Sequence, residues 1–89
     1  MVSSNPFDNP EVSPVFWSAQ DRIDGARWLS KNTKVDQIRK NLAYVKNSLA
    51  KILAGQENPP PNEPLDVCLM RLKTMTEIWS MALSMALAN

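Results

Sequence analysis

Apolar residues between positions 35 and 52 recur at alternating steps of three and four, and this pattern constrains the fold most. The series is Val35, Ile38, Leu42, Val45, Leu49 and Ile52. Such spacing lines one side of an α-helix and does not fit the two-residue alternation of a half-buried strand. Thr33, with Asp36 three residues later, is typical of a helix start, and Gly55 is typical of a helix end. The sequence therefore predicts a helix over residues 34–54.

A second helix is predicted beyond a proline-rich linker. Residues 55–63 contain Pro59, Pro60 and Pro61 in a row, which favours a stiff, extended connection. Beyond the linker the steps of three and four resume at Leu65, Cys68, Leu72, Met75, Trp79, Ala82 and Ala86. This pattern predicts a helix over residues 64–88. Because the linker is long enough for the chain to reverse, we expect the two helices to pack as an antiparallel pair.

The N-terminal third predicts one more helix behind an extended arm. Ser13 and Pro14 are residue types that favour the N-cap and the first helical position. We expect a helix over residues 14–30 that closes over one side of the pair through Phe16, Ile23 and Leu29. Residues 1–12 are polar and contain prolines, which predicts an extended arm. The expected fold is all-α: a helical hairpin plus an extra N-terminal helix, or three-helix bundle, forming one domain over residues 13–89.

Size and composition make several classes of activity unexpected. A chain of 89 residues allows one domain with a marginal core, and its net charge of +1 gives no general attraction to nucleic acid or anionic membranes. Without histidine, the chain lacks the usual general base and the commonest metal ligand. The single Cys68 cannot form an intramolecular disulfide, which fits a reducing compartment and favours a cytoplasmic location. No apolar run reaches the roughly 20 residues of a membrane span. We expect a protein without enzymatic activity, cofactor or metal.

The helix predicted over residues 64–88 is apolar on every side, and from Ile78 onward no charge interrupts it. Such a helix must be buried all round, and we expect two short helices of the same chain to enclose only part of it. Methionine suits adaptable binding surfaces, and tryptophan is a frequent interface anchor. The alternative is that these side chains fill the chain's own core. We predict an interface with a second copy or another protein at Met70, Met75, Ile78, Trp79, Met81, Leu83 and Met85.

The helix predicted over residues 34–54 is basic. One acidic residue, Asp36, accompanies five cations: Lys34, Arg39, Lys40, Lys46 and Lys51. An anionic partner would explain this excess, but a solvated helix surface explains it more simply. Only Tyr44 is available there for base stacking, and no nucleic-acid-binding motif is recognised, so nucleic acid is not an expected partner.

One short linear motif lies in the N-terminal arm. Asn5, Pro6 and Phe7 match the tripeptide that endocytic EH domains bind. The alternative is a simple turn, because Asn-Pro is a common way to begin one.

The range Pro61–Leu65, with the sequence Pro-Asn-Glu-Pro-Leu, resembles the turn of bacterial type III secretion needle subunits. Those subunits are also short chains with an arm, a helix, a turn with two prolines and a second helix that packs in a filament. The resemblance implies a subunit of a secretion needle. We keep a structural subunit of a helical assembly, of the needle, filament or viral type, as the alternative to an interaction module or adaptor. The chain departs from the family at Pro59 and Pro60, in its extra N-terminal helix and in its apolar C-terminal residues.

Overall fold

The computed structural model describes residues 14–88, and all regular structure in that range is helical. A short 3-10 turn, η1 (Pro14–Phe16), precedes three helices, α1 (Ala19–Asn32), α2 (Val35–Leu53) and α3 (Leu65–Ala88). Since these described residues include no strand, the all-α class with three helices is confirmed. The arm predicted over residues 1–12 lies outside the described residues.

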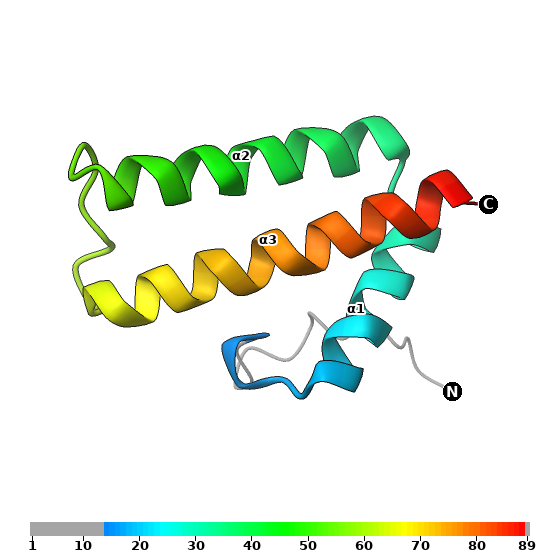
Figure 1. Cartoon of the computed structure of the whole chain (residues 1–89), viewed down its shortest axis with the longest axis horizontal. Helices are drawn as coiled ribbons and strands as arrows, with labels where there is room; N and C mark the ends of the chain where they lie inside the picture. Colours follow the sequence, from blue (N-terminus) through cyan, green and yellow to red (C-terminus); the bar gives the residue numbers. More distant parts are fainter. Residues whose placement is uncertain (1–13, 89) are drawn as a thin grey trace.

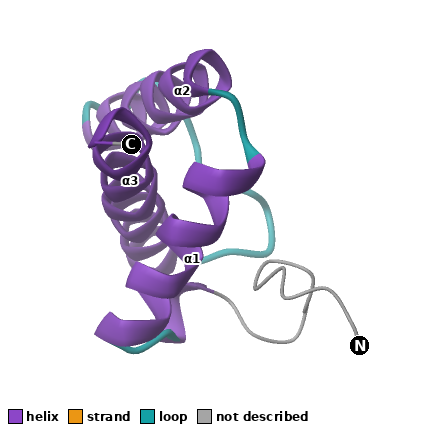
Figure 2. Cartoon of the chain, turned by 90° about the vertical axis from the view of Figure 1, so that its right-hand side faces the viewer, coloured by secondary structure: helices purple, strands orange, loops and turns teal. Residues whose placement is uncertain are grey.

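Helix α3 is the shared packing partner of the other two helices (Figure 1). Helix α2 runs antiparallel to it: Ile38 near the start of α2 joins the cluster that holds Ile78, and Ile52 near its end packs with Leu72. The predicted antiparallel pair is therefore confirmed. Helix α1 crosses the C-terminal half of α3 and makes few contacts with α2 (Figure 2).

The main core lies where the three helices meet. It contains the buried residues Trp17, Ala26, Leu29, Ile38, Ile78 and Ala82. Gly25 and Ala26 are both buried on α1, and such small residues permit a close helix crossing. An ion pair between Arg22 and Glu77, 3.2 Å apart, joins α1 to α3 beside this core. A second, smaller cluster of Ile52, Cys68 and Leu72 lies nearer the linker, where only α2 and α3 meet.

The predicted start of the first helix is wrong. Helix α1 begins at Ala19, and its N-cap is Ser18, whose Oγ accepts a hydrogen bond from the Asp21 N–H at 3.1 Å. The break after η1 alters which side chain points inward. Phe16, predicted to cover the hairpin, is 80% exposed, and the neighbouring Trp17 is buried in its place.

The predicted role of Thr33 is also wrong. Helix α1 continues to Asn32, two residues past the predicted end at 30, so Thr33 becomes its C-cap and donates its N–H to the Leu29 carbonyl at 2.9 Å. Only Lys34 then remains to precede α2, and it makes no side-chain capping bond. The start of α2 is stabilised by tertiary packing of Ile38 rather than by a capping box.

The end of α2 is a Schellman motif, as the position of Gly55 predicts. Gly55 has φ +74° and donates its N–H to the Ile52 carbonyl at 3.1 Å, while Gln56 donates to the Lys51 carbonyl at 2.9 Å. This backbone conformation strains any residue that carries a Cβ.

Gly55→Ala is therefore expected to lower the free energy of unfolding by about 1 kcal/mol. Beyond the adjacent residues, no atom lies within 4 Å of the position that the alanine Cβ would take, so the loss would come from the backbone and not from a clash. Urea denaturation followed by circular dichroism measures the change. The exposed neighbour provides a control, since Gln56→Ala should leave the free energy of unfolding near that of the wild type. Equal stabilities for the two variants would show that the backbone at position 55 does not strain an alanine.

Candidate functional site: the leucine face of the α2–α3 hairpin

The structure places most of the predicted interface residues against the chain's own core. Ile78 is fully buried at the junction of the three helices, so it offers no surface to another chain in this conformation. Of the predicted set only Met70 is largely accessible, at 52% exposure. The others are half-buried and pack against the core: Met75, Trp79, Met81, Leu83 and Met85.

Two short helices thus enclose more of α3 than its composition suggests, because α1 and α2 approach it from different directions (Figure 2). The strip of α3 left to solvent is part polar and part apolar. Its exposed polar residues include Asp66, Lys73, Glu77 and Ser84. Its exposed apolar residues are Leu65, Val67, Met70, Leu87 and Ala88. The apolar C-terminal half of α3 is therefore explained largely by packing within the chain.

A different apolar surface is left partly open on the side of the hairpin away from α1, with two exposed residues and six half-buried ones, among them Leu83, which also packs against the main core. On α2 it consists of Val35, Leu42, Leu49 and Leu53, and on α3 of Leu65, Leu69, Thr76 and Leu83. At 3.6 residues per turn, the residues of each set lie within an arc of about 40° around the axis of their helix. The arc on α3 lies about 160° around that axis from Ile78. We call these eight residues the leucine face. Helix α1 passes behind α3 in Figure 1.

The antiparallel register arranges the leucine face in layers with one residue from each helix. From the linker end the layers are Leu53 with Leu65, Leu49 with Leu69, Leu42 with Thr76, and Val35 with Leu83. Both residues of the second layer pack against the cluster around Ile52, which fixes the register there. On both helices the successive layers are four, seven and seven residues apart.

The first layer is the most accessible, because Leu53 is 60% and Leu65 is 53% exposed, whereas the other members are half-buried. The only polar member is Thr76, whose hydroxyl donates to the Leu72 carbonyl at 2.7 Å. Its methyl group is then free to pack. The leucine face is thus a strip of apolar surface whose one hydroxyl already has a partner.

The α2 edge of the leucine face is basic. Arg39 and Lys46 flank it, and Lys40 and Lys51 lie further round the same helix, all exposed. None of these cations forms an ion pair within residues 14–88. The α3 edge carries both signs of charge, from Asp66, Lys73 and Glu77.

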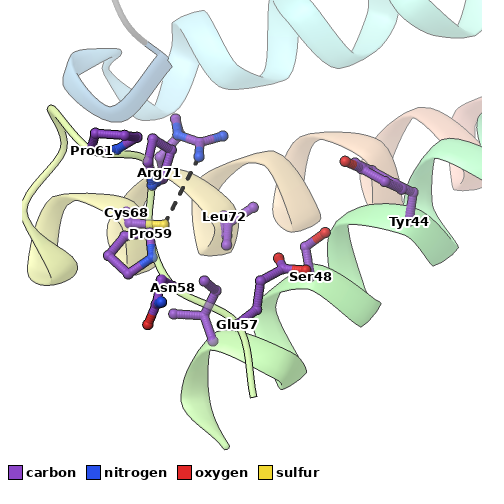
Figure 3. Close-up of a pocket in the computed structure, with 11 residues that line it drawn as sticks. Tyr44, Ser48, Glu57, Asn58, Pro59, Pro61, Cys68, Arg71 and Leu72 are labelled. Atoms are coloured by element: carbon purple, nitrogen blue, oxygen red, sulfur yellow. Dashed lines mark hydrogen bonds between the residues drawn. The ribbon is translucent and has the colours of Figure 1, made fainter. Parts of the chain in front are cut away.

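The opposite side of the hairpin contains a groove of about 350 Å³ between α2, α3 and the proline-rich linker (Figure 3). Its lining includes Tyr44, Ile52, Pro59–Pro61 and Arg71. Arg71 is engaged by Glu63, which accepts from Nε at 3.0 Å through one carboxylate oxygen and from Nη2 at 3.1 Å through the other. This two-point ion pair fastens the end of the linker to α3.

The Glu63–Arg71 pair predicts a specific acid dependence. Hydrogen bonding from Arg71 holds the pKa of Glu63 below its ordinary value of 4.5. The ion pair therefore contributes its full stabilisation above that pH. This contribution is lost as the pH falls through the lower pKa that Glu63 has in the folded protein. Glu63→Gln should lower the free energy of unfolding by about 1 kcal/mol at pH 7. The variant should then lose correspondingly less stability than the wild type when the pH is lowered. Glu57→Gln, an exposed change in the same linker, should retain the wild-type profile; identical pH profiles for all three proteins would contradict the prediction.

Cys68 lies beside the same ion pair, with Arg71 Nη2 3.9 Å from its sulfur, and it is 1% exposed. Burial raises the pKa of the thiol, and the Glu63 carboxylate raises it further. Since the thiolate is the reactive form, this environment opposes nucleophilic chemistry.

A thiol-specific reagent is accordingly expected to modify Cys68 at least about tenfold more slowly in the folded protein than in urea-unfolded chain at the same pH. The rate at which the reagent modifies the thiol, followed through release of its leaving group, measures this difference directly. Comparable rates in the two states would show that the thiol is accessible.

Two further findings concern the described part of the chain. Within residues 14–88, no helix has the length and apolar character needed to cross a membrane. The same residues contain no group of three or more Cys, Asp or Glu side chains placed to hold a metal ion. Asn5, Pro6 and Phe7 lie outside the described residues, so the EH-domain motif stays a prediction.

Comparison with protein-family models, with curated proteins and with solved structures finds no match to this chain. Its function has to be inferred from the chemistry of its own surfaces, among which the leucine face combines two exposed leucines with a row of half-buried apolar residues.

Proposed function

We propose that this chain is a non-enzymatic helical module that binds protein through the leucine face. The observation that carries this proposal is the layered row of leucines on the side of the hairpin that α1 leaves open. Soluble monomers seldom leave a continuous apolar strip of several hundred Å² bare. Covering it with another polypeptide removes that surface from water.

The spacing favours a helical partner over a small ligand. Layers seven residues apart on two neighbouring helices match the repeat with which helices pack side by side. A flat strip of this kind offers no enclosed volume or converging polar groups, which small-molecule sites need.

The groove on the other side of the hairpin supports the part of this proposal that calls the module non-enzymatic. Its arginine and the nearby Glu63 are committed to each other, and its cysteine is buried with a raised pKa. Its lining contains no histidine, the commonest general base.

Affinity capture from the native source tests the proposal. The double variant Leu53→Asp/Leu65→Asp puts two charges on the most exposed layer, and Tyr44→Ser changes a residue 71% exposed on the groove side. Wild type and Tyr44→Ser should recover the same protein, a second copy included, and the double variant should lose it while keeping its helical circular dichroism. Recovery that is equal for all three proteins, or empty for the wild type, would overturn the proposal.

A structural subunit of a helical assembly is the second candidate, favoured by a second group of exposed apolar residues. Phe16 is 80% and Leu87 is 56% exposed, and neither belongs to the leucine face. A filament requires two different surfaces that fit each other. Sedimentation that grows with concentration without a fixed stoichiometry would support this candidate over a discrete complex.

A further inference from the structure

We infer that the leucine face binds a second copy of this chain, in a four-helix dimer in which α2 of each copy lies against α3 of its partner. This inference rests on the proposed function and names the protein that the face binds.

The layers carry the first argument. A four-helix bundle is built from layers that take one side chain from each helix, and each layer of the leucine face supplies two of these four. A second identical hairpin supplies the other two. Thr76 fits such a layer because its hydroxyl is already bonded to the Leu72 carbonyl, so only its methyl group has to enter the core.

The uneven spacing of the layers selects one orientation of the partner. Counted from the linker, the intervals are four, seven and seven residues on both helices. When the two linkers lie at the same end, every layer meets its own copy. In a copy turned end over end the intervals run seven, seven and four, so at most three layers can coincide, and the most exposed layer, Leu53 with Leu65, is left without a counterpart. The two-fold axis therefore runs parallel to the helices.

Charge selects the same arrangement independently. An axis parallel to the helices sets α2 against the partner's α3, whereas the end-over-end dimer sets α2 against α2. The second arrangement would bring Arg39 and Lys46 against the same basic edge, at a cost in like-charge repulsion. The first brings them to an edge of mixed charge, where Lys73 lies between Asp66 and Glu77 and Glu77 is already paired with Arg22, so the repulsion is smaller.

The size of the face suits a dimer. Helix α2 has 19 residues and is thus about 28 Å long at 1.5 Å per residue, and two helices side by side span about 20 Å. The projected area is then roughly 550 Å², and the accessible area is larger because side chains protrude, which approaches the roughly 800 Å² per partner of a stable interface. Dimerisation would also bury Leu49 and Leu69, which pack against the small cluster of Ile52, Cys68 and Leu72.

Sedimentation equilibrium of the full chain across a range of concentrations tests the stoichiometry. The wild type should reach twice the 10.0 kDa chain mass and no more. Leu53→Asp/Leu65→Asp should remain monomeric, with a dissociation constant raised at least about 100-fold. Met70→Asp is the matched control, because Met70 is a similarly exposed apolar residue of α3 outside the leucine face, and it should dimerise like the wild type.

Disulfide cross-linking tests the orientation and does not depend on how the aspartate variants fold. In a Cys68→Ala background, a tagged Lys46→Cys chain is mixed with an untagged Lys73→Cys chain and oxidised. Positions 46 and 73 lie at the same height along the hairpin but on its opposite edges. The inferred dimer brings position 46 of one copy beside position 73 of the other, so the disulfide should join the two different chains. Cross-linking of Lys46→Cys only to itself would indicate the end-over-end dimer and overturn the inferred arrangement.

The outcomes separate this inference from the proposed function. A wild type that stays monomeric throughout the concentration range, or that grows beyond two chains, overturns the dimer. If affinity capture still recovers another protein that Leu53→Asp/Leu65→Asp loses, the proposed function survives with a different partner. If capture recovers nothing either, both fall.

Discussion

Ile78→Ala should lower the free energy of unfolding by about 4 kcal/mol, near the upper end for such truncations. Ile78 is fully buried in the cluster formed by residues of all three helices, so the cavity left behind has little room to collapse. Domains of this size have total stabilities of only about 5–10 kcal/mol, so the variant should lose a large part of its unfolding free energy. Urea denaturation monitored by circular dichroism and tryptophan fluorescence provides the measurement.

Val67→Ala is the matched control for this experiment. Val67 also lies on α3 and loses a similar β-branched side chain, but it is 37% exposed. It should cost well under 1 kcal/mol. If Ile78→Ala lost no more stability than Val67→Ala, the three-helix junction could not be the main core of the protein.

The double variant Met81→Lys/Met85→Lys is expected to have an effect of similar size, about 4 kcal/mol, and to release α1 from α3. Both methionines are half-buried and pack against the main core. Met85 also lines a cavity with Arg27 and Lys31 of α1, so its replacement adds a cation beside two others. Burial of an unpaired charge is costly, and like-charge repulsion adds to the loss. Near-ultraviolet circular dichroism should show that the tryptophans of the main core, Trp17, Trp28 and Trp79, lose their fixed environment.

Met70→Lys/Ser84→Lys makes the same change in charge at two exposed positions of α3 and serves as the control. It should leave the fold and the tryptophan signal unchanged. The comparison also discriminates between the two interpretations of the α3 methionines. If Met81 and Met85 faced a partner and not the core, their replacement would affect association while the chain stayed folded.

The apolar periodicity of the sequence predicts the hairpin well. Ile38 and Ile52 on α2, with Cys68, Leu72 and Ala82 on α3, all belong to the predicted series and all are buried. Helices α2 and α3 begin and end within a residue of the predicted bounds. This succeeds because a stripe at helical spacing identifies the side of a helix that is buried, whatever element covers it.

The course of α1 is harder to predict because local signals compete there. Ser13 and Ser18 are both suitable N-caps, and the choice between them determines whether Phe16 or Trp17 points inward. In the structure the buried position of Trp17 goes with the cap at Ser18. Local capping preference is worth about 1 kcal/mol, less than the burial of a tryptophan, so tertiary packing decides.

Periodicity also does not reveal which element covers an apolar side of a helix. Met75, Met81 and Met85 of α3 indicate burial correctly, whereas Met70 is exposed, and α1 reaches α3 across its small residues Gly25 and Ala26. The leucine face, by contrast, has a signal in the sequence. Leu69, Thr76 and Leu83 form a second series of seven-residue steps beside the main α3 series, and a helical-wheel comparison of the two would separate them.

The central position of α3 determines when the chain can fold as a ribosome makes it. Helices α1 and α2 emerge first, yet they contact each other little and share their core only through α3. Short helices without a packing partner are marginal in water, so residues 14–64 are expected to stay largely unstructured during translation. Ile78 and Ala82 must leave the exit tunnel before the core can close. The core therefore cannot close before α3 has been made, and until then the apolar residues of α1 and α2 are available to chaperones that recognise nascent chains.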